Sequence, residues 1–192
     1  MEGQNQNLNL NRKIQYTRMV LSDGLIELMK AKPFEKITVK ELCERANVNR
    51  STFYTHYEDI YALLRSIEEE TLAWERGEME TLLGKWEEGK RATIRSLERL
   101  FECFVENRKY LQVLMSEKGS ISFQKKFFFV AYQMNDFPAA QSRAAPPFEK
   151  EMRFLFVVNG GVGIVQHWLK TGMKESPRAI AEILYDIALS VF

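Results

Sequence analysis

The chain has 192 residues, of which 45% are hydrophobic and 28% charged, and its formal net charge is +1. This composition is typical of a globular protein and excludes a largely disordered chain. No run of about eighteen apolar residues occurs and the N-terminus is polar, so we expect no membrane span and a cytoplasmic protein. Two cysteines and two well-separated histidines show no ligand spacing, so we expect no metal site and no cofactor.

The N-terminal part of the chain predicts a polar tail followed by one helix. Residues 1–11 are rich in Asn and Gln without periodicity, which favours a disordered tail. Residues 12–31 carry apolar side chains at helical spacing. Gly24 lies in the middle of this helix, where a small residue is expected to allow close packing against the next helices. Lys32-Pro33 ends the helix.

Residues 38–57 predict two short helices joined by a tight turn. Thr38 is a good N-cap, and Glu41 three residues later completes a capping box. Asn47 suits the left-handed conformation that often ends a helix, and Asn49 can cap the second helix. On that helix Phe53 and Tyr57, four positions apart, are expected to point inward.

The outward face of the second short helix has the chemistry of a DNA-reading surface. Nearly all of its side chains donate hydrogen bonds and none is acidic, as a helix in the major groove requires. These side chains are Arg50, Ser51, Thr52, Tyr54, Thr55 and His56. Residues 12–56 contain nine Lys and Arg against five Asp and Glu, a local charge of +4 that is balanced by −3 elsewhere. The asymmetry is modest, and paired copies would bind DNA better than one.

The residues 33–42 and 47–57 together resemble the DNA-binding domain of the tetracycline-repressor (TetR) family. The most specific part is Thr-Phe-Tyr-x-His-Tyr over residues 52–57, at its distance from Ile-Thr-Val over residues 37–39. The resemblance implies a three-helix helix-turn-helix domain over residues 12–58. Its implied base contacts are Arg50, Ser51 and Tyr54, and its implied phosphate contacts are Lys40, Thr52, Thr55 and His56. The chain departs from the family pattern at Gly24, at Asn47 and at Ile60, where the family often has a phosphate-binding Lys.

Residues 59–192 predict a helical body. Asp59 is expected to cap a long fourth helix over residues 60–83, on which residues 68–70, three glutamates, are expected to form a solvated face. Two more helices are expected at residues 149–171 and after Ser176-Pro177. In the resembling family the fourth helix transmits ligand binding to the DNA-binding helices, and the last two helices form a four-helix bundle between two subunits.

The glycines at residues 160, 161 and 163 are expected to allow close helix packing. A nucleotide-binding loop would need a preceding strand and a further glycine, and the flanking residues continue a helix instead. The candidates for the dimer interface are Gly160, Gly163, Trp168, Ile183 and Ile187.

Aromatic side chains are frequent in the body, and two interpretations stay open. They form an ordinary core, or they line a cavity for an apolar or aromatic effector, as is common in the family. The candidates for effector binding are Phe101, Phe104, Phe128, Tyr132, Phe156 and Asn159.

The sequence therefore predicts an all-α protein with an N-terminal helix-turn-helix domain and a C-terminal domain for effector binding and dimerisation. We expect a sequence-specific transcriptional regulator, a ligand-responsive repressor that binds a palindromic operator in double-stranded DNA as a homodimer. The alternative is a DNA-binding regulator controlled by a protein partner without a small-molecule effector. The looser resemblance of the body is to a branch that includes activators, so the direction of regulation stays open. No catalytic motif is present, so we do not expect an enzyme.

Overall fold

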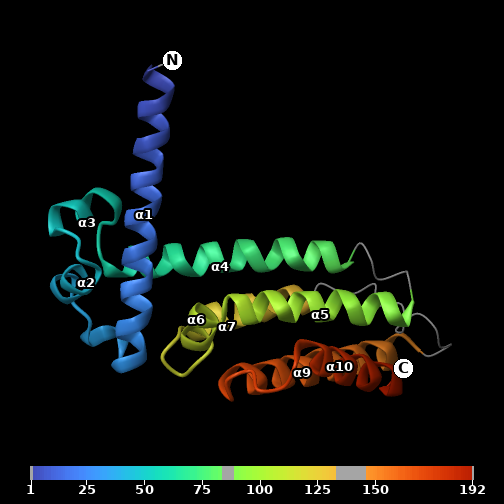
Figure 1. Cartoon of the computed structure of the whole chain (residues 1–192). Helices are drawn as coiled ribbons and strands as arrows, with labels where there is room; N and C mark the ends of the chain where they lie inside the picture. Colours follow the sequence, from blue (N-terminus) through green and yellow to red (C-terminus); the bar gives the residue numbers. More distant parts are fainter. Residues whose placement is uncertain (1, 84–88, 133–145, 192) are drawn as a thin grey trace. The chain divides into compact units, whose positions relative to one another are not determined.

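The computed structural model describes residues 2–83, 89–132 and 146–191, and the elements in these ranges are all helices (Figure 1). This confirms the predicted all-α class. The chain divides into two compact units, Met1–Glu70 (unit 1) and Thr71–Phe192 (unit 2). The division falls inside α4 (Ile60–Leu83), whereas the sequence placed the boundary just before this helix. None of the described helices is long and apolar enough to cross a membrane.

Unit 1 is built from four helical segments and the first part of α4. They are α1 (Glu2–Ala31), the 3-10 turn η1 (Phe34–Lys36), α2 (Val39–Ala46) and α3 (Arg50–His56). Figure 1 shows α2 and α3 lying beside α1. Their apolar faces meet in a small core. Its fully buried members include Leu21, Leu25, Ile26, Met29, Leu42, Phe53 and Leu63.

The first helix is longer than the sequence predicts. It begins at Glu2, so residues 2–11 are helical where we expected a disordered tail; Met1 lies outside the described residues. Once the packed part of a helix has formed, each added residue gains one hydrogen bond, and Asn and Gln are tolerated at such positions. Composition and lack of periodicity therefore did not reveal this extension.

Gly24 brings α1 close to α2, as predicted. A Cβ atom added at Gly24 would lie 3.2 Å from Leu42 Cδ1 and 3.5 Å from Ala46 Cβ. A larger side chain would therefore push the two helices apart.

The ends of α2 follow the predicted cap chemistry, and the start of α3 does not. Thr38 accepts a hydrogen bond from the Glu41 amide at 3.3 Å, and Asn47 ends α2 in the left-handed conformation with φ 52°. The Glu41 carboxylate contacts Lys32 Nζ at 2.5 Å rather than the Thr38 amide, so the predicted capping box is only half formed. Asn49 occupies the N-cap position of α3, but its side chain makes no capping hydrogen bond.

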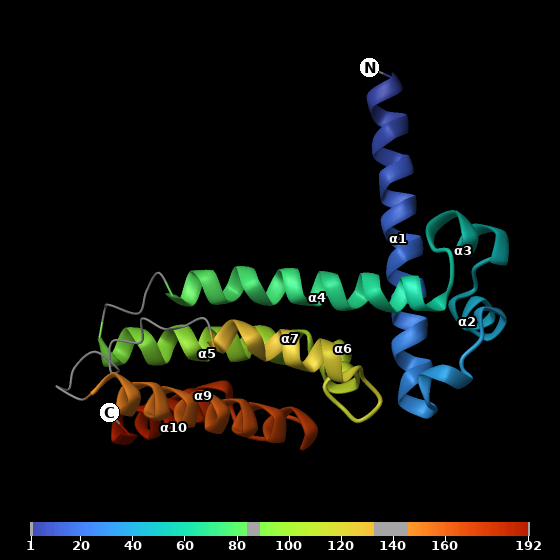
Figure 2. The ribbon, with the colours of Figure 1, turned by 180° about the vertical axis from the view of Figure 1, so that it is seen from behind.

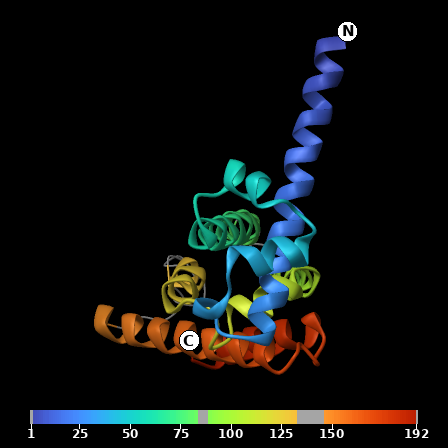
Figure 3. The same cartoon turned by 90° about the vertical axis from the view of Figure 1, so that its left-hand side faces the viewer.

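Unit 2 consists of the second part of α4 and five further described helices. They are α5 (Lys90–Glu106), α6 (Arg108–Leu114), α7 (Ile121–Tyr132), α9 (Pro147–Lys170) and α10 (Pro177–Val191). Figures 2 and 3 show α9 and α10 next to each other, on the same side of α5 and α7. Ser176 caps α10 as predicted, since its Oγ accepts a hydrogen bond from the Ala179 amide at 3.2 Å.

Candidate nucleic-acid interface

α3 has one buried face and one exposed face. Phe53 is fully buried, and Tyr57, which follows the helix as its C-cap, is 8% exposed. Their rings lie 5.9 Å apart, so they anchor the helix to the core of unit 1. This is the inward pair that the spacing predicts.

The predicted DNA-contacting side chains all lie on the accessible side of unit 1. Tyr54 is 57% exposed, and its ring meets Phe53 edge-on at 5.3 Å. The remaining members are exposed or half-buried, and they are Lys40, Arg50, Ser51, Thr52, Thr55 and His56. The Thr55 hydroxyl donates to the Thr52 carbonyl at 2.7 Å, which limits its rotation.

A shallow depression separates Lys40 of α2 from Arg50 at the start of α3. The turn residues Asn47, Val48 and Asn49 line it as well. Lys40 is only loosely paired with Glu44, at 4.0 Å, and both side chains are about two-thirds exposed. An exposed pair of this kind contributes little to stability, so Lys40 is available for a phosphate.

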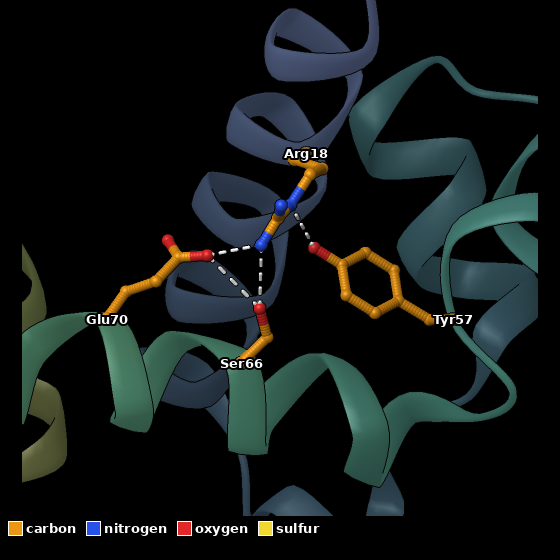
Figure 4. Close-up of polar contacts among 4 residues, drawn as sticks. All are labelled: Arg18, Tyr57, Ser66 and Glu70. Carbon is orange, nitrogen blue, oxygen red and sulfur yellow. Dashed lines mark hydrogen bonds and ion pairs between the residues drawn. The ribbon is translucent and has the colours of Figure 1, made fainter.

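A polar cluster ties the end of α3 to both long helices of unit 1 (Figure 4). Arg18 on α1 donates from Nε to the Tyr57 hydroxyl at 3.2 Å and from Nη2 to Ser66 Oγ at 3.1 Å. The same Nη2 forms an ion pair with Glu70, and Ser66 Oγ lies 3.2 Å from the Glu70 carboxylate. The hydrogen bond to Tyr57 is the main cause that raises the pKa of Arg18. The guanidinium is therefore charged at any physiological pH.

This cluster was not found by sequence reasoning. Arg18 is separated from Tyr57, Ser66 and Glu70 by 39, 48 and 52 positions, so no local pattern joins them. Glu70 lies on the predicted solvated face and is 64% exposed, and it also pairs with Arg18. The cluster joins Tyr57, at the end of α3, to α1 and α4.

Comparison with known proteins decides the family. Residues 21–67 match the family described as "Bacterial regulatory proteins, tetR family", and residues 93–190 match "Transcriptional regulator C-terminal region" of TetR proteins. The chain belongs to the TetR family. It is therefore a transcriptional regulator with a helix-turn-helix DNA-binding domain, and members of this family are transcription factors rather than enzymes.

Individual TetR-type relatives agree with this assignment. An uncharacterized HTH-type transcriptional regulator of Bacillus subtilis (strain 168), YxbF, is 25% identical over 175 residues. The match covers 87% of this chain but only 43% of the relative. A TetR transcriptional regulator from Streptococcus agalactiae 2603V superimposes with a TM-score of 0.62 at 20% identity, covering 95% of this chain and 98% of the other. The dihydroxyacetone kinase operon activator DhaS gives a TM-score of 0.58 at 16% identity, covering 91% and 94%.

The residues predicted to bind an effector do not all come together in this TetR protein. Phe101 and Phe104 are buried and in ring contact at 5.7 Å. Phe156 is 65% exposed and Asn159 is exposed, with its amide bonded to the Leu155 carbonyl of its own helix. These two therefore do not share the buried surroundings of Phe101 and Phe104, because the helical spacing of α9 does not say which face the rest of unit 2 covers. The side chains of Phe128 and Tyr132 lie outside the described residues.

The residues predicted for a dimer interface also divide into two groups. Gly160 and Gly163 are exposed on α9, and a Cβ atom added at either would meet nothing within 4 Å. Ile183 and Ile187 on α10 are 47% and 39% exposed. Trp168 is a correction: it is 1% exposed, because its ring packs against other residues of its own unit.

Trp168 is a core residue by its contacts. Its ring lies 5.7 Å from that of Phe101, and its indole N–H donates to the Glu175 carbonyl at 3.0 Å. A side chain held in this way by its own chain cannot supply surface to a second subunit.

Proposed function

We propose that this TetR-family protein is a ligand-responsive repressor that binds a palindromic operator as a homodimer, in the cytoplasm where bacterial DNA is found. The observation that carries the DNA-binding part is the exposed, acid-free face of α3, with Tyr54 at its centre and Arg50 and Ser51 one turn before it. Such a face offers hydrogen-bond donors to base edges in the major groove, while Lys40, Thr52, Thr55 and His56 contact phosphates.

Dimerisation is supported by an unusual exposed stripe on α9. Its apolar members recur at helical spacing and are followed by two exposed glycines on the same face. The stripe contains Phe148, Met152, Leu155, Phe156, Gly160 and Gly163. On the adjacent helix α10, Ile183 and Ile187 are exposed as well. Exposed apolar side chains of this kind are what subunit interfaces cover, and the glycines would permit close approach of a second copy.

Control by a small molecule is supported by the buried aromatic rings of unit 2 and by the continuity of α4. The Phe104 ring contacts the rings of Phe101 and Phe127, and Trp74 of α4 contacts the same Phe104 ring. α4 continues from this ring cluster to Glu70, which contacts Arg18 and through it Tyr57 at the end of α3. An effector that displaces α4 would therefore alter the support of the DNA-reading helix, provided that it binds the two states with different affinity.

The relatives bear on the direction of regulation. One structural neighbour is named an operon activator, so the fold by itself does not determine the direction of regulation. We propose repression because a dimer bound across a palindrome near its own promoter blocks transcription without further contacts.

The test is a footprint on the DNA upstream of the protein's own gene, with Tyr54→Ala and Ile121→Ala compared. The unaltered protein should protect two half-sites about one helical turn, roughly 34 Å, apart. Tyr54→Ala should lose this protection, and Ile121→Ala, which removes a 72% exposed side chain of unit 2, should retain it. An unchanged footprint with Tyr54→Ala would show that α3 is not the reading helix.

A further inference from the structure

Glu75 lies on the inner face of α4, within unit 2. Trp74, Glu75, Glu78 and Met79 lie on one side of the helix, because Glu78 is four positions from Trp74 and three from Glu75, and Met79 is four positions from Glu75. Glu75 is 3% exposed and Met79 is 6% exposed. A carboxylate therefore occupies a position where α4 otherwise presents apolar or partly buried side chains.

Contacts on either side of Glu75 show that this face is turned to α5. The Trp74 ring lies 5.9 Å from the Phe104 ring, and the Cys103 thiol is hydrogen-bonded to the Glu78 carboxylate. Glu75 is located between these two contacts along the helix. It therefore lies next to the aromatic cluster of unit 2.

That cluster supplies several π-faces close to one another. Phe104 contacts Phe101 at 5.7 Å and Phe127 at 5.5 Å. Phe127 in turn contacts Phe123 at 5.9 Å. The rings come from α5 and α7, and Trp74 of α4, the residue next to Glu75, joins them through Phe104.

The Glu75 carboxyl group lacks the partner that its burial calls for. Its Oε2 atom is buried and has no hydrogen-bond partner in the described structure. Burial raises the pKa of this carboxyl to about 7, and the nearby charge of Arg76 offsets only part of the rise. An unpaired buried carboxylate is costly, and a Leu or Met at this position would avoid the cost. Groups kept at such a cost are concentrated at functional sites.

We propose that Glu75 is the charge-recognising residue of the effector site and that the effector is an organic cation with an aromatic or apolar body. The carboxylate supplies the counter-charge, and the rings of Trp74, Phe104 and their neighbours supply cation–π and apolar contacts. This inference rests on the proposed ligand-responsive function and narrows the class of effector from apolar compounds in general to cationic ones. A neutral apolar compound would leave the Glu75 oxygen without a partner.

The test uses two matched pairs of probes on the full chain. Benzyltrimethylammonium is compared with its neutral isostere neopentylbenzene, and 1-methylquinolinium with 1-methylnaphthalene, by isothermal titration calorimetry. The unaltered protein should bind the cations more tightly than their isosteres. Glu75→Gln keeps the shape of the side chain and removes its charge. It should weaken cation binding about 10- to 100-fold, which is the loss expected for one desolvated charge-assisted contact. Binding of the neutral isosteres should be unaffected. Glu80→Gln, an exposed position on the same helix, is the control and should bind like the unaltered protein.

Three results would overturn the inference: neither cation binds, the neutral isosteres bind as well as the cations, or Glu75→Gln binds the cations with unchanged affinity. Circular dichroism of both variants establishes that they are folded. Binding of the unaltered protein to its upstream DNA is measured in the same preparations without probe. Failure there would refute the proposed function, whereas failure of cation binding with intact DNA binding would refute only this inference.

Discussion

The buried carboxyl group of Glu75 makes the stability of the protein depend on pH in a way that one substitution removes. Its pKa rises from the ordinary 4.5 to about 7 in the folded protein because burial disfavours the charged form. The folded state therefore holds this proton more tightly than the unfolded state. The penalty is absent below about pH 4.5, grows as pH rises through the window to about 7, and is then constant.

The size of the effect follows from the same two values. Each tenfold change in the proton equilibrium is worth about 1.4 kcal/mol, so the rise corresponds to roughly 3 kcal/mol of lost stability above pH 7. Glu75→Gln cannot ionise and avoids this loss. For a chain of this length, the variant should melt roughly 6 to 12 °C above the unaltered protein at pH 8. At pH 5, just above the unfolded-state pKa, only a small part of this loss has developed, so the difference should shrink to roughly 2 to 3 °C.

The assay is thermal unfolding followed by circular dichroism at 222 nm, at pH 5 and pH 8. Among neighbouring groups, the Cys103 thiol faces the same side of α4, and burial raises its pKa, so it remains neutral across this window. Glu80→Gln, an exposed position, should leave the melting temperature unchanged at both values. If Glu75→Gln is no more stable than the unaltered protein at pH 8, the Glu75 carboxylate has a stabilising partner in the folded protein, and the reasoning is refuted.

Three further substitutions test the remaining parts of the account. Tyr57→Phe removes the hydroxyl that accepts from Arg18 Nε and keeps the ring that packs on Phe53. It should lower the free energy of unfolding in urea by about 1 kcal/mol and weaken operator binding several-fold. Unchanged operator binding would argue against a positioning role for the polar cluster. Gly24→Leu should destabilise the protein by about 1–3 kcal/mol, because the new side chain overpacks against Leu42. Gly77→Ala should stabilise it by about 1 kcal/mol, because a Cβ atom there meets nothing within 4 Å. Equal effects of the two substitutions in urea titrations would contradict the close packing of α1 on α2. Phe156→Asp places a charge on the apolar stripe of α9 and should convert a dimer into a 22.5 kDa monomer in light scattering, and a dimer that persists would locate the interface elsewhere.

Local signals predicted the local structure well. Thr38 and Asn47 lie at the ends of α2 where their cap chemistry placed them, and Phe53 and Tyr57 point inward at the expected spacing. These features depend on neighbours within four residues, which a sequence displays directly.

Features that depend on distant partners were not predictable in the same way. Phe101 and Phe156 are both aromatic residues on amphipathic helices, yet one is 2% and the other 65% exposed, because packing of the other helices decides which face is covered. Arg18 and Glu75 belong to charged, unremarkable stretches of sequence. Their significance comes from contacts across the fold in one case and from the lack of a contact in the other.

The central claim is that this TetR-family protein reads DNA through α3. The most direct test is titration of the purified protein against its own upstream region and against unrelated DNA, each at 50 mM and 200 mM salt. The account predicts tight, specific binding, in the nanomolar range typical of such regulators, that weakens steeply with salt because several phosphates are neutralised. Equal, weak binding to both DNAs at both salt concentrations would contradict it.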